Sequence, residues 1–195
     1  MLPSQESRSR LVQTALKLFA SRGYHNTSIA DILRESGCTR GVLYYYFPSK
    51  EELGYAAIDE GLQVALAQGT RKYLQTNEHP IDRLSNALDA LPNVIQSGGV
   101  DVSTTDLSFR MATIHEGFRK HLEGWLEPTV DQVEQVVHRG IADGQIADSV
   151  DPRQLAHVLV TMGMGIQHMS RLWHRELICE NARRWLKKYL NSLRR

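Results

Sequence analysis

Apolar residues recur every three or four positions along nearly all of this 195-residue chain. Such spacing places them on one face of an α-helix, whereas the strict alternation that is typical of a half-buried strand is absent. No internal repeat interrupts the pattern. It therefore predicts an all-α protein built from nine helices.

The first predicted helix covers residues 7–22, and Gly23 ends it because glycine readily adopts the left-handed conformation of a helix stop. Its expected buried residues are Leu11, Ala15, Leu18 and Phe19. Thr27 or Ser28 then caps a second helix, since their side-chain oxygens accept free backbone N–H groups. This helix is expected to bury Ile29, Ile32 and Leu33.

A sharp turn is predicted at Gly37, because glycine takes a positive φ without steric cost. Thr39 caps a third helix that ends near Tyr46, and Pro48 closes it. Helix, glycine turn and helix form the sequence pattern of a helix-turn-helix unit. The second helix of such a unit can lie in the major groove of DNA while the first braces it.

Six further helices are predicted after Pro48, the first of them opened by the capping box that runs from Ser49 to Glu52. Their expected ranges are 50–74, from Pro80 to the Gly98-Gly99 break with a bend at Pro92, 106–114, 118–143 with a kink at Pro128 and an end at Gly144, from Pro152 onward, and from about Leu177 onward. Residues 98–105 form the clearest predicted loop. We expect two domains, over residues 1–50 and 51–195.

The last two predicted helices each carry a broad apolar stripe. The first stripe consists of Leu155, Val158, Leu159, Met162 and Ile166, and the second of Ile178, Ala182, Trp185, Leu186, Tyr189, Leu190 and Leu193. Such faces favour a helical bundle that a second copy of the chain completes. Packing within one chain is the open alternative, since amphipathic helices normally cover a core.

The formal net charge of +1 is unevenly distributed, at +4 over residues 1–50 and −3 over residues 51–195. A basic N-terminal quarter is typical of a protein that contacts nucleic acid at one end. No apolar run approaches the roughly 18 residues of a membrane span, and the N-terminus lacks a signal-peptide pattern. Cys38 and Cys179 show no metal-ligand spacing. We expect a cytoplasmic protein without metal, cofactor or membrane association.

The third helix carries the residue types that DNA recognition needs. Arg40 stands near its start, and arginine can donate two parallel hydrogen bonds to a guanine. Gly41 allows close approach of the backbone. Three successive residues cannot all face one core because they diverge by about 100°, so at least one of Tyr44, Tyr45 and Tyr46 is expected to be exposed. Half-buried packing is the alternative for these tyrosines, and a solvated surface charge is the alternative for Arg40 and for Lys50.

The segment from Arg10 to Leu53 resembles the DNA-binding domain of TetR-type (tetracycline-repressor-like) bacterial transcription regulators. The resemblance rests on the continuous string from Gly37 to Leu53, on residues 15–19 and on residues 22–24; Cys38 departs from the usual small aliphatic residue. It implies that the groove-facing helix presents Thr39, Arg40, Gly41, Tyr44, Tyr45 and Tyr46. It further implies phosphate or groove-rim contacts for Thr27, Ser28 and Lys50.

The resemblance also implies a homodimer formed by the last two long helices, a palindromic double-stranded DNA operator and a small-molecule effector, with repression relieved by the effector. The effector pocket would lie between residues 51 and 171. Its candidate lining residues combine apolar bulk with occasional polar groups: Leu62, Leu107, Met111, Ile114, His115, Trp125, Met162, Met164 and His168. Ordinary core packing is the alternative for each of them.

Three other functions are alternatives to DNA binding by the third helix. A zinc hydrolase needs a second histidine four residues after His115, where the chain has Arg119, and nucleophile motifs are absent, so no catalytic residue is expected. A redox sensor would act through Cys38, in the turn before the third helix. The third alternative is DNA or membrane binding through the basic C-terminal segment, which could instead be only the solvated face of the last helix. The basic residues of this segment are Arg183, Arg184, Lys187, Lys188, Arg194 and Arg195.

Overall fold

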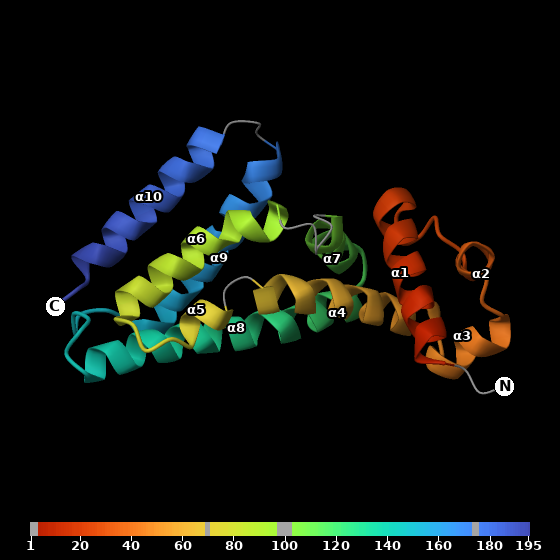
Figure 1. The fold of residues 1–195 in the computed structure, drawn as a ribbon, viewed down its shortest axis with the longest axis horizontal. Helices are drawn as coiled ribbons and strands as arrows, with labels where there is room; N and C mark the ends of the chain where they lie inside the picture. The colour runs from red at the N-terminus through yellow and green to blue at the C-terminus, as the bar shows by residue number, and fades with distance from the viewer. Residues whose placement is uncertain (1–3, 69–70, 97–102, 173–175) are drawn as a thin grey trace. The chain divides into compact units, whose positions relative to one another are not determined.

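The computed structural model describes residues 4–68, 71–96, 103–172 and 176–195. These residues form helices and no strand (Figure 1), which confirms the all-α class. The helices are α1 (Gln5–Arg22), α2 (Ile29–Ser36), α3 (Arg40–Tyr46), α4 (Lys50–Gln68), α5 (Arg71–Leu74), α6 (Pro80–Gln96), α7 (Ser103–Ile114), α8 (Glu116–Ala142), α9 (Pro152–Leu172) and α10 (Glu176–Ser192).

The chain forms two compact units, which interleave along the sequence. The N-terminal unit comprises Met1–Val64 and Val100–Glu123, and the C-terminal unit comprises Ala65–Gly99 and Gly124–Arg195. Helix α8 contributes residues to both units. The predicted domains, residues 1–50 and 51–195, divide the chain by function and not by compactness, and this division stays a prediction.

In the N-terminal unit, α1 packs against α2, α3 and α7. Its four predicted core residues are buried together with Val12, and Ile32 of α2 is buried beside half-buried Ile29 and Leu33. Gly23 and Gly37 take φ values of +86° and +66°, which glycine alone adopts without strain. Both glycines therefore end helices where the sequence predicts.

Several helix boundaries differ from those predicted. Within the expected helix over residues 50–74 the structure describes α4 and α5, and residues 69–70 between them lie outside the described ranges. Ser103, Thr104 and Thr105 belong to α7 instead of the predicted loop. Serine and threonine are common at the start of a helix, because their hydroxyls can accept free backbone N–H groups. The Gly98-Gly99 break lies outside the described residues.

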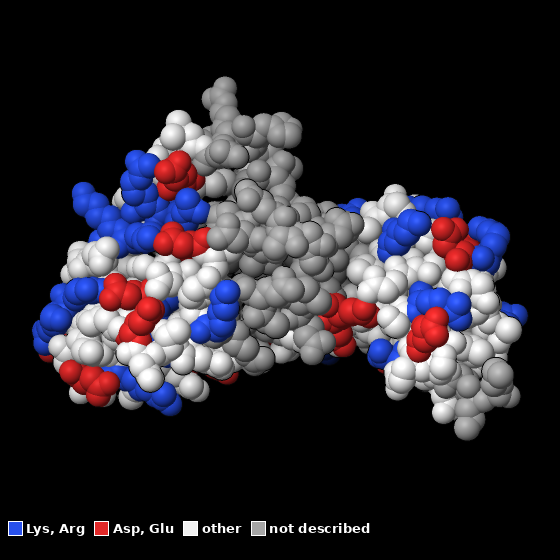
Figure 2. Space-filling model, in the orientation of Figure 1, with Lys and Arg blue, Asp and Glu red and all other residues white. Residues whose placement is uncertain are grey.

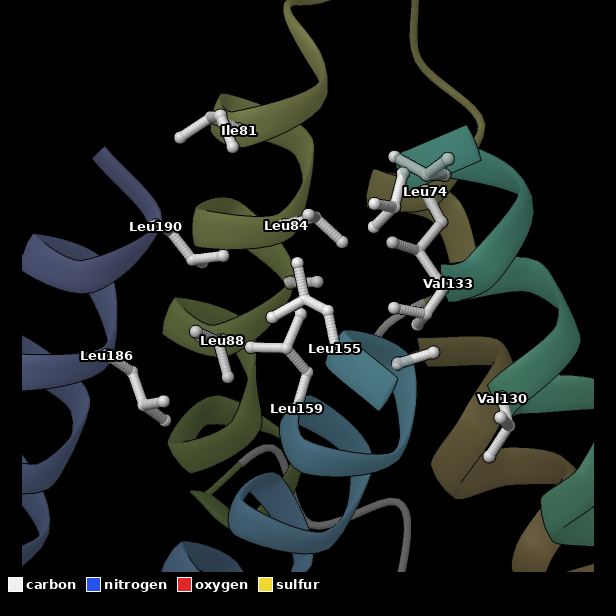
Figure 3. Packing of buried hydrophobic residues seen from close by; sticks show 14 of the residues in the cluster. Leu74, Ile81, Leu84, Leu88, Val130, Val133, Leu155, Leu159, Leu186 and Leu190 are labelled. Atoms are coloured by element: carbon white, nitrogen blue, oxygen red, sulfur yellow. The ribbon is translucent and has the colours of Figure 1, made fainter. Parts of the chain in front are cut away.

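Buried side chains of four helices and of α5 meet in the core of the C-terminal unit (Figure 3). Leu84 and Leu88 of α6 pack with residues of α8, α9 and α10, among them Val133, Leu159 and Leu186. Backbone hydrogen bonds from Ala147 to Leu193 and from Arg195 to Gln145, at 2.9 and 3.0 Å, attach the C-terminus to the segment after α8.

Burial divides the two predicted apolar stripes. Leu155, Leu159 and Ile166 of α9 are buried, as are Leu186 and Leu190 of α10. Other stripe residues face solvent in the monomer: Val158, Trp185 and Tyr189 are 41%, 60% and 41% exposed. Within the described ranges, no helix is long and apolar enough to cross a membrane.

Candidate nucleic-acid interface

Helix α3 is attached to the N-terminal unit on one side and exposed on the other. Leu43 and Phe47 are buried and anchor it, whereas Tyr44 and Tyr45 are 43% and 63% exposed. Tyr46 is half-buried and makes an edge contact with Tyr45, at 4.9 Å between ring centroids. The helix therefore presents two tyrosines to solvent, while packing accounts for part of the third.

The start of α3 is fixed by its cap. The Thr39 hydroxyl accepts a hydrogen bond from the backbone N–H of Val42 at 3.3 Å. Arg40 is exposed, and its guanidinium lies 5.9 Å from the centroid of the Tyr44 ring. A Cβ at Gly41 would meet no atom within 4 Å, so no contact with the described residues requires glycine there. Gly41 is exposed, so its backbone is open to solvent beside Arg40.

The start of α2 is fixed by a reciprocal capping box. The Ser28 hydroxyl accepts from the N–H of Asp31 at 3.1 Å, and the Asp31 carboxylate accepts from the N–H of Ser28 at 3.0 Å. A hydrogen bond from the Ser28 hydroxyl is the main reason that the pKa of Asp31 falls to about 2, and Arg34 lowers it further. Ser28 is exposed, but its hydroxyl already serves this box.

The expected contact of Thr27 with a DNA phosphate does not fit the structure, because the Thr27 side chain is buried. Thr27 is fully buried, and its hydroxyl donates to the carbonyls of Gly23 and Leu18 at 2.9 and 3.3 Å. Its own N–H donates to the carbonyl of Tyr24. Thr27 therefore fixes the loop between α1 and α2 from within, and the cap of α2 is Ser28.

Lys50 is half-buried, and its ammonium group has a partner inside the N-terminal unit. Its Nζ donates to the carbonyl of Tyr24 at 2.6 Å and lies 4.2 Å from the centroid of the Tyr24 ring. Partial burial lowers the pKa of Lys50. Sequence reasoning missed Tyr24 as this partner, although Tyr24 belongs to the segment that carries the family resemblance. Lys50 is therefore more than a surface charge at the start of α4.

The first turns of α4 and α8 approach closely within the same unit. A Cβ at Gly54 would lie 2.8 Å from the Phe118 ring, and a Cβ at Gly117 would lie 2.1 Å from the Tyr55 hydroxyl. Phe118 is fully buried and makes edge contacts with the rings of Tyr24 and Tyr55. The loop between α1 and α2, whose Tyr24 accepts the hydrogen bond of Lys50, is thus packed against the beginning of α8.

The nine candidate effector-contacting residues are divided between the two units. In the N-terminal unit Leu62, Leu107 and Met111 are buried, whereas Ile114 and His115 are exposed. The side chain of His168 lies outside the described part of the structure. The others, in the C-terminal unit, are half-buried: Trp125, Met162 and Met164. As an effector site this set stays a prediction.

The basic side chains of α10 gather on one surface of the C-terminal unit (Figure 2). Most of them have carboxylate partners: Arg183 and Lys187 pair with Asp89, and Arg184 pairs with Glu180. This pairing favours a solvated, charge-balanced helix face over a nucleic-acid site.

Cys38 is half-buried, with its Sγ 3.9 Å from the carbonyl oxygen of Ser7.

Comparison with known proteins identifies the family. Residues 11–57 match the description "Bacterial regulatory proteins, tetR family", and residues 104–186 match "Tetracyclin repressor-like, C-terminal domain". The chain belongs to the TetR family. The members of this family are DNA-binding transcription regulators and not enzymes, which settles the enzymatic alternative.

Individual relatives agree with this assignment to the TetR family. The chain is 24% identical over 193 residues to the uncharacterized HTH-type transcriptional regulator YfiR of Bacillus subtilis, covering 95% of this chain and 92% of that one. The crystal structure of a TetR transcriptional regulator from Chloroflexus aurantiacus matches with a TM-score of 0.83 at 25% identity, over 98% and 97% of the two chains. A regulator from Saccharomonospora viridis, solved in complex with choline, matches in fold with a TM-score of 0.71 at 23% identity, over 97% and 95%.

Proposed function

We propose that this TetR-family regulator binds a palindromic double-stranded DNA operator as a homodimer, and that it represses transcription until a small-molecule effector releases it. In this proposal residues 1–50 read the DNA, and residues 51–195 bind the effector and form the dimer. The observation that carries the proposal is the exposed side of α3, where Arg40, Tyr44 and Tyr45 lie beside Gly41.

The chemistry of that surface suits a DNA groove. The guanidinium of Arg40 can donate two parallel hydrogen bonds to a guanine edge. The hydroxyls of Tyr44 and Tyr45 can donate to phosphate oxygens, and such contacts set the register of the protein on the duplex. Thr39 and Ser28 lie at exposed helix starts, where free backbone N–H groups favour anions. Tyr46 and Lys50 complete the proposed surface.

The exposed apolar sides of α9 and α10 support the homodimer. Val158, Met169, Leu177, Trp185 and Tyr189 are all more than a third exposed in the monomer. Exposed apolar side chains on neighbouring helices are typical of protein–protein contacts. A twofold dimer of helix-turn-helix units reads two half-sites about 34–36 Å apart, which explains the expected palindrome.

Gly165 of α9 gives the dimer proposal a second support. It is exposed, and a Cβ there would meet no atom within 4 Å. Glycine inside a helix costs about 1 kcal/mol relative to alanine, and no contact within the described chain offsets that cost. A helix of a second copy, lying close to the backbone at Gly165, would explain the residue.

Release by a small molecule is the finer part of the proposal. The Saccharomonospora viridis regulator holds choline, so this fold accommodates small organic molecules. An effector need only prefer the conformation that does not fit the operator. A preference of about 5.5 kcal/mol would change the bound population from 99:1 to 1:99.

Selection of genomic DNA fragments with the purified full-length protein tests the operator. We expect recovery of a few promoter fragments that share a palindrome, with footprints on two half-sites. The Arg40→Ala variant is the matched control and is expected to recover far fewer fragments. Failure of the wild-type protein to enrich any fragment at low ionic strength would overturn the proposal.

Reporter transcription from a recovered promoter then separates repression from activation, since deletion of the regulator raises expression only under repression. A deproteinised small-molecule extract of the same cells tests release. Loss of the complex in the extract supports an effector, and retention in extracts from all growth conditions contradicts it.

A further inference from the structure

A polar pocket of about 310 Å³ lies within the C-terminal unit, among α6, α8 and the segment after α5. Most of its lining residues are polar, and they include Asn77, Arg83, Gln135 and Arg139. None of the nine residues expected to contact an effector lines it. The pocket is therefore a separate feature, and its lining is too polar for an apolar ligand.

The two arginines of the pocket differ from the other arginines of the unit. The structure describes seven arginine side chains in the C-terminal unit, and five have a carboxylate oxygen within 4 Å: Arg153, Arg183, Arg184, Arg194 and Arg195. Among the described residues, Arg83 and Arg139 have no such partner. Both of these uncompensated guanidinium groups lie at the same pocket.

The guanidinium of Arg83 is held in place and partly desolvated. One terminal nitrogen, Nη2, donates to the carbonyl of Leu74, the last residue of α5. Its Nε is buried with no hydrogen-bond partner among the described atoms. Burial, and then the charge of Arg139, lowers the pKa of Arg83. Arginine nevertheless stays protonated in proteins, so two like charges share this pocket.

We propose that the pocket binds a small anion through a carboxylate or phosphate group held by Arg83 and Arg139. The planar guanidinium matches the two oxygens of such a group and forms short, charge-assisted hydrogen bonds with it. An anion would also relieve the repulsion between the two arginines. Amide groups of Asn77 and Gln135 are available at the same wall for further oxygens.

Capping of α5 is the competing explanation for Arg83, because the bond to Leu74 satisfies a free carbonyl at a helix end. It does not explain Arg139, which is exposed on α8 and gains nothing from a second cation nearby. The size of the pocket is at the lower end of the roughly 300–1,000 Å³ that is usual for small-molecule sites. A small anion fits this volume.

Thermal unfolding of the full-length protein tests the site, with inorganic phosphate and succinate as separate probes and sodium chloride at matched ionic strength as the reference. We expect one probe or both to raise the Tm above the chloride value. The shift is roughly 5 °C or more at about 100 times the Kd, because ligands stabilise the folded state by mass action. Phosphate and succinate then assign the class of anion.

Three variants test whether the rise in Tm comes from binding at this pocket. Arg139→Gln removes an exposed charge without losing a described hydrogen bond, and it is expected to abolish the shift. Arg184→Gln, at another exposed arginine of the same unit, is the matched control and is expected to keep it. Arg83→Lys keeps the charge but loses the planar fork, and a several-fold weaker Kd is expected by titration calorimetry. A wild-type shift no larger than that of chloride, or a full shift in Arg139→Gln, would overturn the proposal.

Discussion

Two helices of this protein expose a pair of aromatic residues, and the surroundings of the two pairs differ. On α3 the pair is Tyr44 and Tyr45, beside the cationic Arg40. On α10 it is Trp185 and Tyr189, whose rings stack with centroids 5.8 Å apart and planes inclined by only 4°. Exposure of aromatic rings therefore indicates a contact surface in both places, but it does not by itself identify the partner.

The neighbouring side chains distinguish the two surfaces. Around α3 the exposed groups are hydroxyls, a guanidinium and the free N–H groups of helix starts, which suit a polyanion. The stacked pair on α10 lies on a helix whose exposed apolar residues include Leu177, and α9, packed against α10, exposes Val158 and Met169. Such a surface suits another apolar helix. We therefore infer DNA as the partner of α3 and a second chain as the partner of α10.

Replacing Trp185 with Glu is expected to have the largest effect. A carboxylate in the centre of an apolar interface would be desolvated without a partner, so the dimer is expected to dissociate at micromolar concentration. Operator affinity is then expected to fall by about 100-fold or more, because two linked half-site contacts become one. Light scattering after size exclusion measures the mass, and an operator titration measures the affinity. Arg184→Glu, on the charged side of the same helix, is expected to remain dimeric; a dimeric Trp185→Glu protein would assign the apolar surface to another role.

Replacing Arg40 with Ala is expected to reduce operator affinity by about 1–3 kcal/mol while leaving affinity for random DNA nearly unchanged. The physical reason is that a guanidinium on a guanine edge discriminates between sequences. Titrations on operator and random duplexes at one salt concentration measure both affinities. Lys17→Ala on α1 is the control for loss of a positive charge. Equal losses on both duplexes would contradict base recognition by Arg40.

Replacing Lys50 with Met is expected to weaken binding to operator and random DNA by similar factors. Its ammonium group keeps hydrogens for a phosphate beside the bond to Tyr24, so the slope of log K against log salt is expected to fall by about 1. Titrations over a range of salt concentrations give the slope. If the affinity falls while the slope stays constant, Lys50 acts only by holding the loop at Tyr24.

Replacing Asp31 with Asn is expected to have the smallest effect, and a pH-dependent one. The folded-state pKa of Asp31, about 2, lies below its ordinary value. The ionised carboxylate therefore stabilises the fold at pH values above about 4, and this contribution is lost as the pH falls toward 2. The difference in free energy of unfolding between wild type and variant is expected to shrink over that range. Ser28→Ala is expected to raise the pKa of Asp31 in an NMR titration, and an unchanged pKa would contradict the role of the capping box.

The prediction from sequence succeeded best where the determinants are local. The cap at Thr39 and the stops at Gly23 and Gly37 depend on residues within one or two turns, and the structure confirms them. Of the two candidate caps of α2, Ser28 is the one observed. The resemblance of residues 10–53 to a TetR-type DNA-binding domain is likewise confirmed by the family match to residues 11–57. The roles of single residues in DNA or effector binding stay predictions.

Sequence did not decide a residue's role where that role depends on distant partners. Thr27 was expected to contact phosphate, but the carbonyls of Leu18 and Gly23 take its hydroxyl. Trp185 and Tyr189 belong to the same apolar stripe as Leu186 and Leu190, yet only the leucines are covered by the core. Helical spacing identifies an apolar stripe, but its angular width does not tell which part a neighbouring helix covers.

The sequence by itself determined the all-α class, the cap at Thr39, the stops at Gly23 and Gly37, and the family, because these depend on short-range sterics, backbone hydrogen bonding and a continuous motif. Only the tertiary structure decided which residues of those helices remain exposed, that Lys50 bonds to Tyr24, and that Arg83 and Arg139 share a pocket. Arg83 and Arg139 are 56 positions apart in the chain. Burial and electrostatic interactions act through space, so such contacts exist only once the helices have packed.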